Sequence, residues 1–229
     1  MNIRNDWQIS SKNIYNMLFV FDLDGTLLNT IDDLAAAANH ALRTCGFATR
    51  SVEECRQFVG NGVNKLLERA LPAGQRTPEN LAKMKGAFVH YYSLHLADAT
   101  RPYDGILETL TALQARGIKL AVASNKYQQA TEKLITHFFP TVSFVAVFGQ
   151  RPDVPLKPNP QIVHDILRLA NEDASHCFYV GDSQTDMQTA QQAAVKACAV
   201  TWGFRTREEL EVYHPAYVID HPRELLQLI

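Results

Sequence analysis

The stretch FVFDLDGTL, residues 19–27, decides how the chain folds and where its chemistry lies. It begins as a short apolar strand and ends in two acidic residues, Asp22 and Asp24, followed by Gly25. Side chains alternate along a strand, so the two carboxylates would share a face if the strand continued, but Gly25 predicts a turn at the mouth of a sheet. Unpaired buried carboxylates are costly, so the pair predicts a bound cation or a nucleophile beside an acid-base group. The alternative is a strand-end turn with two solvated acids.

The composition is that of a globular protein with a substantial core. The chain has 229 residues, is 46% hydrophobic and 20% charged, and carries a formal net charge of −2. It fits one large domain or two smaller ones, and no basic run favours a nucleic-acid partner. The longest apolar stretches, such as 144–148, are far shorter than a membrane span, and no amino-terminal apolar segment with a cleavage site is present. We therefore expect a cytoplasmic protein without a membrane partner.

The cysteines are predicted to be reduced. They lack Cys-x-x-Cys spacing and the density of a disulfide framework. They lie at positions 45, 55, 177 and 198.

Two segments lie on either side of the strand region 17–30: a polar segment before it and a helical segment after it. Residues 1–16, MNIRNDWQISSKNIYN, are polar without a clear period and predict a loose extension. From residue 31 to 101 helical spacing dominates. Ser51-x-x-Glu54 matches a capping box, and Thr77 before a proline matches a helix start. The segment 31–101 therefore predicts an all-helical domain of four or so helices.

From residue 102 onward, apolar strands alternate with amphipathic helices. This order indicates an α/β fold with a parallel sheet covered on both faces. Because the first strand precedes the helical domain, the core is expected to be discontinuous, built from residues 17–30 and 102–229. The expected strands are 118–124, 144–148, 177–181, 197–201 and 217–219, and the expected helices are 106–116, 128–137, 161–170 and 186–195.

Polar residues follow several of these strands. Open parallel sheets place their sites beyond the carboxyl ends of the strands, so these residues are candidates for one crevice. Each has an ordinary structural explanation when taken alone, such as a helix cap or a surface charge. Together, a hydroxyl, a lysine and several acids suit phosphoryl transfer, which needs neutralisation of the phosphoryl oxygens. The candidates are Asp22, Asp24, Ser124-Asn125-Lys126, Lys157 in a proline-rich loop, and Gly181-Asp182-Ser183 with Asp186.

These groups of polar residues resemble, in residue type and in order along the chain, the four motifs of the haloacid dehalogenase superfamily of phosphotransferases. The resemblance implies a Rossmann-like core in which Asp22 is the nucleophile that forms an aspartyl-phosphate. It implies that Asp24 protonates the leaving oxygen and then activates water. Lys157 would hold the phosphoryl charge and keep Asp22 ionised and aligned. True dehalogenases lack the second acid, so the presence of Asp24 favours phosphate chemistry.

The resemblance also implies the remaining site residues. Ser124 would bind the phosphoryl group, with Thr26 and Asn125 as further phosphate-binding residues. Asp182 would bind Mg²⁺ together with Asp22 and the backbone carbonyl of Asp24, because Mg²⁺ prefers oxygen ligands and water. Asp186 would order a metal-bound water or brace Lys157.

The helical insertion resembles the small helical cap of one subclass of the superfamily, and three segments resemble the phosphoglycolate phosphatases closely. The segments 58–71, 120–126 and 200–204 carry this resemblance. Two positions depart from the group: Ala194 stands where it usually has Gly, and Asn29 replaces a frequent Asp. The break Gly60-Asn61-Gly62 is the expected substrate contact of the cap, since two glycines and a helix amino terminus let backbone amides approach a small anion.

The expected function is that of a Mg²⁺-dependent phosphatase acting on a small phosphorylated metabolite, with 2-phosphoglycolate as a candidate, in a monomer or homodimer. An inorganic pyrophosphatase of the same superfamily would have the same fold and motifs, and it is an alternative. A sugar-phosphate mutase is another, although mutases usually carry Asp-Gly-Val where this chain has Gly25-Thr26. A phosphonate hydrolase would need a cap lysine, for which Lys65 is the candidate. The rival of another class is a non-catalytic phosphate-binding regulator, against which the intact acids argue.

Overall fold

A parallel sheet forms the centre of the computed structural model, which describes residues 17–229. Within these residues the sheet has six strands in the order β5-β4-β1-β6-β7-β8, and every neighbouring pair is parallel. The predicted α/β fold is therefore confirmed. The strands are β1 (Leu18–Phe21), β4 (Lys119–Tyr127), β5 (Ala146–Gln150), β6 (Cys177–Gly181), β7 (Lys196–Val200) and β8 (Tyr217–Ile219).

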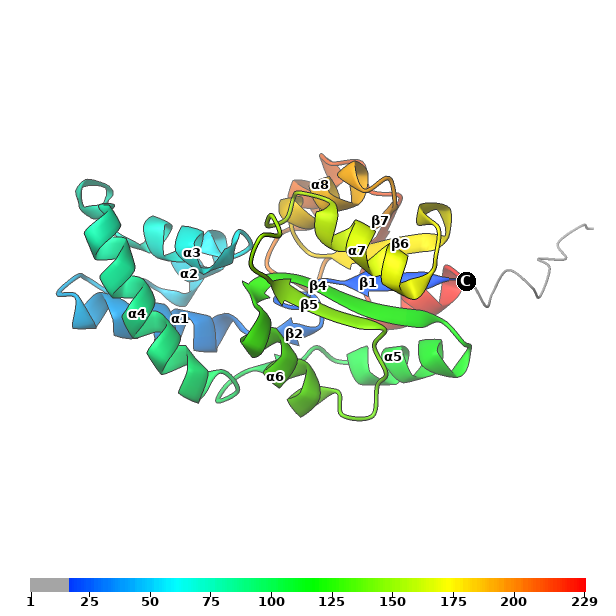
Figure 1. The fold of residues 1–229 in the computed structure, drawn as a ribbon, viewed down its shortest axis with the longest axis horizontal. Helices are drawn as coiled ribbons and strands as arrows, with labels where there is room; N and C mark the ends of the chain where they lie inside the picture. The colour runs from blue at the N-terminus through cyan, green and yellow to red at the C-terminus, as the bar shows by residue number, and fades with distance from the viewer. Residues whose placement is uncertain (1–16) are drawn as a thin grey trace, which may run out of the picture.

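Helices cover both faces of the sheet (Figure 1). The alternation of β1 explains the two layers: Phe19 and Phe21 pack in one hydrophobic cluster with α5, and Leu18 and Val20 pack in another with α7. The flanking helices are α5 (Ile106–Ala115), α6 (Gln128–Phe138), α7 (Gln161–Ala170), α8 (Gln184–Gln192) and α9 (Arg207–Glu211). Short 3₁₀ turns are η2 (Ala73–Gln75), η3 (Ala174–His176) and η4 (Pro222–Gln227).

Several predicted boundaries were wrong by a few residues. β4 continues past Ser124 to Tyr127, and β5 begins at Ala146 instead of residue 144. α8 begins at Gln184, before the predicted 186, because Ser183 and Asp186 form a capping box at its amino terminus. After α8, Ala194 has φ 55°, the left-handed conformation that glycine usually supplies at a helix end.

Four helices pack together beyond the carboxyl ends of the strands (Figure 1). They are α1 (Ile31–Thr44), α2 (Val52–Phe58), α3 (Gly62–Ala70) and α4 (Pro78–His95), and we call them the cap. The predicted capping box of Ser51 and Glu54 begins α2, and the Thr77 hydroxyl caps α4. An all-helical insertion after the first strand is therefore confirmed.

Two connections join the cap to the sheet domain, and they run side by side. β2 (Leu28–Asn29) pairs antiparallel with β3 (Arg101–Pro102). The buried carboxylate of Asp33, at the start of α1, accepts hydrogen bonds from the backbone of Ala99 and Thr100 and from the Thr100 hydroxyl. These contacts tie the outgoing and returning chains to each other, a feature that the helical pattern did not predict.

Other predictions concern the thiols, the membrane and the first residues. All four cysteines are free, and burial raises the pKa of the Cys55 thiol to about 11. Between residues 17 and 229, no helix has both the length and the apolar character needed to span a bilayer. The predicted extension, residues 1–16, lies outside the described residues.

Candidate active site

Asp22 follows β1 directly and the chain then turns at Gly25. The Asp22 backbone N–H donates to the Val180 carbonyl, so Asp22 lies at the carboxyl end of β1, between β4 and β6. Gly25 has φ 87°, and a Cβ built there would overlap the carboxylate of Asp182. Only glycine allows this turn and this close approach. The turn therefore places the loop after β1 against Asp182, the residue that follows β6.

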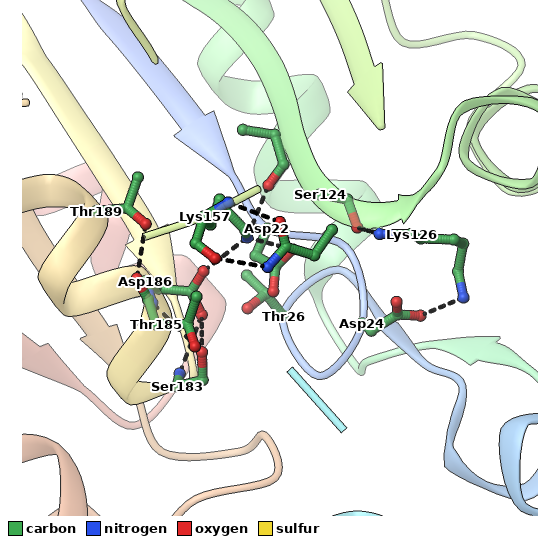
Figure 2. Close-up of polar contacts among 12 residues, drawn as sticks. Asp22, Asp24, Thr26, Ser124, Lys126, Lys157, Ser183, Thr185, Asp186 and Thr189 are labelled. Carbon is green, nitrogen blue, oxygen red and sulfur yellow. Dashed lines mark hydrogen bonds and ion pairs between the residues drawn. The ribbon is translucent and has the colours of Figure 1, made fainter. Parts of the chain in front are cut away.

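Lys157 is a buried cation held on several sides. Its Nζ lies 2.9 Å from Asp22 Oδ1 and 2.8 Å from Asp186 Oδ1, and it donates to the Tyr179 hydroxyl and the Ala123 carbonyl, each at 2.9 Å. Burial alone would lower the pKa of Lys157, but the carboxylates of Asp186 and Asp22 raise it well above its usual value. The ammonium group is thus a fixed positive charge beside Asp22 (Figure 2).

Three acids form a cluster around this lysine. Oxygens of Asp22, Asp182 and Asp186 lie within 4.8 Å of one another, and all three residues are buried. Burial, and then the charge of Asp186, raise the pKa of Asp22 well above its usual value despite the opposing effect of Lys157. The same two causes raise the pKa of Asp182 to about 7. One lysine does not balance three carboxylates, so the cluster suits a bound cation.

The donor set fits Mg²⁺. Each oxygen of Asp186 accepts two hydrogen bonds, Oδ1 from Lys157 and Tyr179 and Oδ2 from the backbone and hydroxyl of Ser183, whereas each oxygen of Asp182 accepts one and keeps a lone pair. Asp22 and Asp182 are therefore the carboxylates that would hold the ion, and oxygen ligands are the kind that Mg²⁺ prefers. Asp186 contacts Lys157 at 2.8 Å, and bracing this lysine, one of the two roles expected for it, stays a prediction.

Asp182 is oriented by two hydrogen bonds. The Thr26 hydroxyl donates to its Oδ1 at 2.9 Å, and the Phe204 backbone N–H donates to its Oδ2 at 2.7 Å. The Thr26 hydroxyl thus hydrogen-bonds Asp182, and the contact expected between Thr26 and phosphate stays a prediction.

Asp24 has a different environment from Asp22. Its Oδ1 accepts a hydrogen bond of 2.6 Å from the Thr30 hydroxyl and lies 3.0 Å from Lys126 Nζ. Lys126 also donates to the hydroxyl of Tyr92, from cap helix α4, at 3.0 Å. Burial opposes the charge of Lys126, but Asp24 and Tyr92 raise the pKa of the lysine above its usual value. Figure 2 shows Asp24 and Lys126 apart from the cluster around Lys157.

Ser124 and Asn125, at the end of β4, support the loops around the site. The Ser124 hydroxyl accepts from the backbone N–H of Lys126. The Asn125 amide donates to the carbonyls of Gly60 and Lys157, and its oxygen accepts from the Lys157 N–H at 2.8 Å. Asn125 thus joins the loop of the buried lysine to the cap.

A cavity lies between these residues and the cap. It encloses about 50 Å³, which favours a small substrate. Gly60 and Gly62 line it, whereas the side chain of Asn61 donates to Thr185 and accepts from Arg69. The remaining lining includes Asp22, Asp24, Ser124, Asn125, Lys126, Tyr92, Tyr127, Asp182, Ser183 and Arg205 with apolar cap residues.

Three residues of this site were missed from sequence, and a fourth, Lys126, was a strand-end candidate without an assigned role. Asking which cation faces Asp24 would have given Lys126 that role. Tyr179 inside β6 and Tyr92 inside α4 gave no signal, because buried tyrosines are usual in strands and helices. Arg205 lies just after a segment already singled out, and its guanidinium donates to the carbonyls of Arg56, Gln57 and Val59 at the end of α2.

Comparison with known proteins places this geometry in a family. The model of the haloacid dehalogenase-like hydrolases matches residues 19–200. The chain is a haloacid dehalogenase-like hydrolase. The phosphoglycolate phosphatase of Mesorhizobium japonicum is 35% identical over 209 residues, which cover 89% of this chain and 90% of that protein. That of Vibrio parahaemolyticus is 31% identical over 93% of this chain and 95% of its own.

A solved structure of a related protein has the same fold as this hydrolase. The predicted phosphoglycolate phosphatase from Haemophilus somnus superposes with a TM-score of 0.87 at 28% identity and covers 93% of this chain and 98% of that chain. The family and these relatives make the protein a phosphatase of phosphoric monoesters, as the sequence predicted.

Proposed function

We propose that this hydrolase is a Mg²⁺-dependent phosphatase that cleaves a small phosphomonoester through an aspartyl-phosphate, with 2-phosphoglycolate as the first substrate to test. The observation that carries the proposal is the position of Asp22. It lines the cavity, it lies 2.9 Å from Lys157 Nζ, and its Oδ1 accepts no hydrogen bond of good geometry from residues 17–229. A carboxylate that is aligned but not fully hydrogen-bonded is suited to nucleophilic attack.

In the first half of the reaction, Asp22 forms a bond to phosphorus while the bond to the leaving oxygen breaks. Asp24 gives its proton to that oxygen. Its Oδ1 is engaged by Thr30 and Lys126, and no side chain of residues 17–229 bonds Oδ2, which leaves Oδ2 for the proton transfer. Lys157 and the donors at the end of β4 hold the phosphoryl group in place.

In the second half, Asp24 takes a proton from water, which attacks phosphorus and releases phosphate from Asp22. Mg²⁺ held by Asp22 and Asp182 would neutralise negative charge on the phosphoryl oxygens. The contacts of Arg205, Asn61 and Asn125 keep the cap against the sheet domain, which excludes bulk water from the leaving group.

The support for 2-phosphoglycolate comes from the relatives and from the small cavity. The test is phosphate release by the purified full chain with Mg²⁺ from 2-phosphoglycolate, p-nitrophenyl phosphate, inorganic pyrophosphate and hexose phosphates. We expect kcat/KM for 2-phosphoglycolate to exceed the other values by about tenfold or more. A higher value for pyrophosphate would replace the proposal with a pyrophosphatase, and no turnover of any compound would favour a phosphate-binding regulator.

A further inference from the structure

Resting on this proposed function, we propose that Lys126 is the anion-binding residue for the leaving group and that it selects monoesters whose alcohol part carries a carboxylate close to the ester oxygen. Lys126 Nζ lies 3.0 Å from Asp24 Oδ1. Asp24 must reach the leaving oxygen to protonate it. The lysine therefore lies on the side of the site that receives the alcohol part of the substrate, and a carboxylate one carbon away from the ester oxygen falls within its reach.

The other cations of the site are already used. Lys157 contacts Asp22, Asp186, Tyr179 and the Ala123 carbonyl. Arg205 donates to three backbone carbonyls of the cap. An ammonium group has three N–H donors, and within residues 17–229 the contacts of Lys126 are Asp24 and Tyr92. Lys126 is thus the cavity cation with remaining donor capacity.

A second, independent observation lies beside this lysine. The hydroxyl of Tyr127 is buried, and no group of the described chain gives it a hydrogen bond. Tyr127 lines the same cavity, and its ring lies edge-on to that of Tyr92 with the centroids 6.4 Å apart. A buried hydroxyl without a partner costs free energy, which a ligand oxygen would recover.

The rest of the cap side of the cavity is apolar, being lined by Leu34, Val59, Val63, Leu66 and Phe88. An ammonium group with neighbouring hydroxyls, set among apolar side chains, recognises a single small anion better than a neutral polyol. Hydrogen bonds to charged groups contribute more free energy than those between neutral groups. The substrate class is therefore the phosphate ester of a short hydroxy acid.

The experiment compares two esters that differ only in this group, 2-phosphoglycolate and 2-hydroxyethyl phosphate, with the full chain and Mg²⁺. We expect the wild-type protein to prefer the acid by about 100-fold in kcat/KM. Lys126→Met should reduce this ratio to near one, mainly through a higher KM for the acid, and Tyr127→Phe should reduce it severalfold. Lys85→Met, which removes an exposed lysine from α4, is the matched control and should keep the ratio.

If Lys126→Met does not fold by circular dichroism, Lys126→Gln supplies the comparison, because it keeps a donor for Tyr92 without the positive charge. An unchanged ratio in a folded variant, with both esters slowed equally, would overturn the proposal and leave Lys126 as a residue that only positions Asp24. Equal turnover of both esters by the wild type would also overturn it. Absence of turnover of both esters and of p-nitrophenyl phosphate is a different result, since it refutes the phosphatase reaction proposed above.

Discussion

Asp22 and Asp24 are two residues apart in sequence, yet they belong to two different regions of the site. We call the region of Asp22, Lys157, Asp182 and Asp186 the phosphoryl side, and the region of Asp24, Lys126, Tyr92 and the cavity lining the leaving-group side. The phosphoryl side consists of residues from the sheet domain and is closely hydrogen-bonded. The leaving-group side joins the sheet domain to the cap through the contact of Lys126 with Tyr92.

This difference shows how one fold can keep its reaction while changing its substrate. Every phosphomonoester presents the same phosphoryl group, so the phosphoryl side has one task and a rigid, buried arrangement. The alcohol part varies between substrates, and it faces residues that the cap contributes. We expect substitutions on the phosphoryl side to abolish turnover of all substrates and those on the leaving-group side to change the preference among them.

Substitution of the two acids tests this contrast with the largest expected effect. Asp22→Asn removes the attacking carboxylate, so turnover of 2-phosphoglycolate and of p-nitrophenyl phosphate should both fall to background. Asp24→Asn keeps the backbone and the phosphoryl side, so kcat for 2-phosphoglycolate should fall by about 100-fold through slower proton transfer. p-Nitrophenolate is a better leaving group and needs less protonation, so its release should fall less.

Asp32→Asn, at an exposed position at the start of α1, is the matched control and should behave as the wild type. Near-normal turnover by Asp22→Asn would eliminate the covalent mechanism. Equal losses of both substrates in Asp24→Asn would remove the distinction between the two sides.

Removal of the metal tests the phosphoryl side alone. Dialysis against EDTA should abolish activity towards every substrate, and Mg²⁺ should restore it, Mn²⁺ replacing Mg²⁺ better than the larger Ca²⁺. Because burial raises the pKa of Asp182, a bound cation should also stabilise the fold. Saturating Mg²⁺ should raise the Tm by roughly 5 °C, and Asp182→Asn should remove most of this shift.

Asp104→Asn, on the exposed surface, is the control for that shift. Full activity after EDTA treatment, or the same Tm increase in Asp182→Asn, would contradict the assignment of the metal to Asp22 and Asp182.

The two regions also differ in how far the sequence predicted them. Asp22 and Asp182 directly follow apolar strands, and a parallel sheet brings strand ends to one edge, so local pattern was enough to place them together. Lys126 meets Tyr92 only because α4 folds back over the end of β4, and Arg205 meets Val59 across 146 positions of the chain. No local periodicity encodes such contacts.

The same reason accounts for what was missed in the fold. The long helices and most strands follow from their apolar periods. β2 and β3 contain two residues each, too few for a pattern, and they form only because the outgoing and returning chains lie together. The roles expected for Gly60-Asn61-Gly62 and for the phosphate-binding hydroxyls remain predictions, because they depend on a bound substrate.

The smallest expected effect concerns Arg205, which joins the two regions. Its guanidinium donates to three carbonyls at the end of α2, and the preceding residue, Phe204, donates its N–H to Asp182. Arg205→Gln should therefore loosen the cap without removing any hydrogen bond of the phosphoryl side. We expect the free energy of unfolding to fall by roughly 1–2 kcal/mol and KM for 2-phosphoglycolate to rise severalfold, with kcat reduced less.

Arg207→Gln, which breaks only exposed ion pairs with Glu211 and Asp220, is the matched control and should change little. Urea unfolding and steady-state kinetics measure both quantities. If Arg205→Gln instead lowers kcat for p-nitrophenyl phosphate as much as for 2-phosphoglycolate, the effect reaches Asp182 through Phe204, and the cap and the metal site act as one unit.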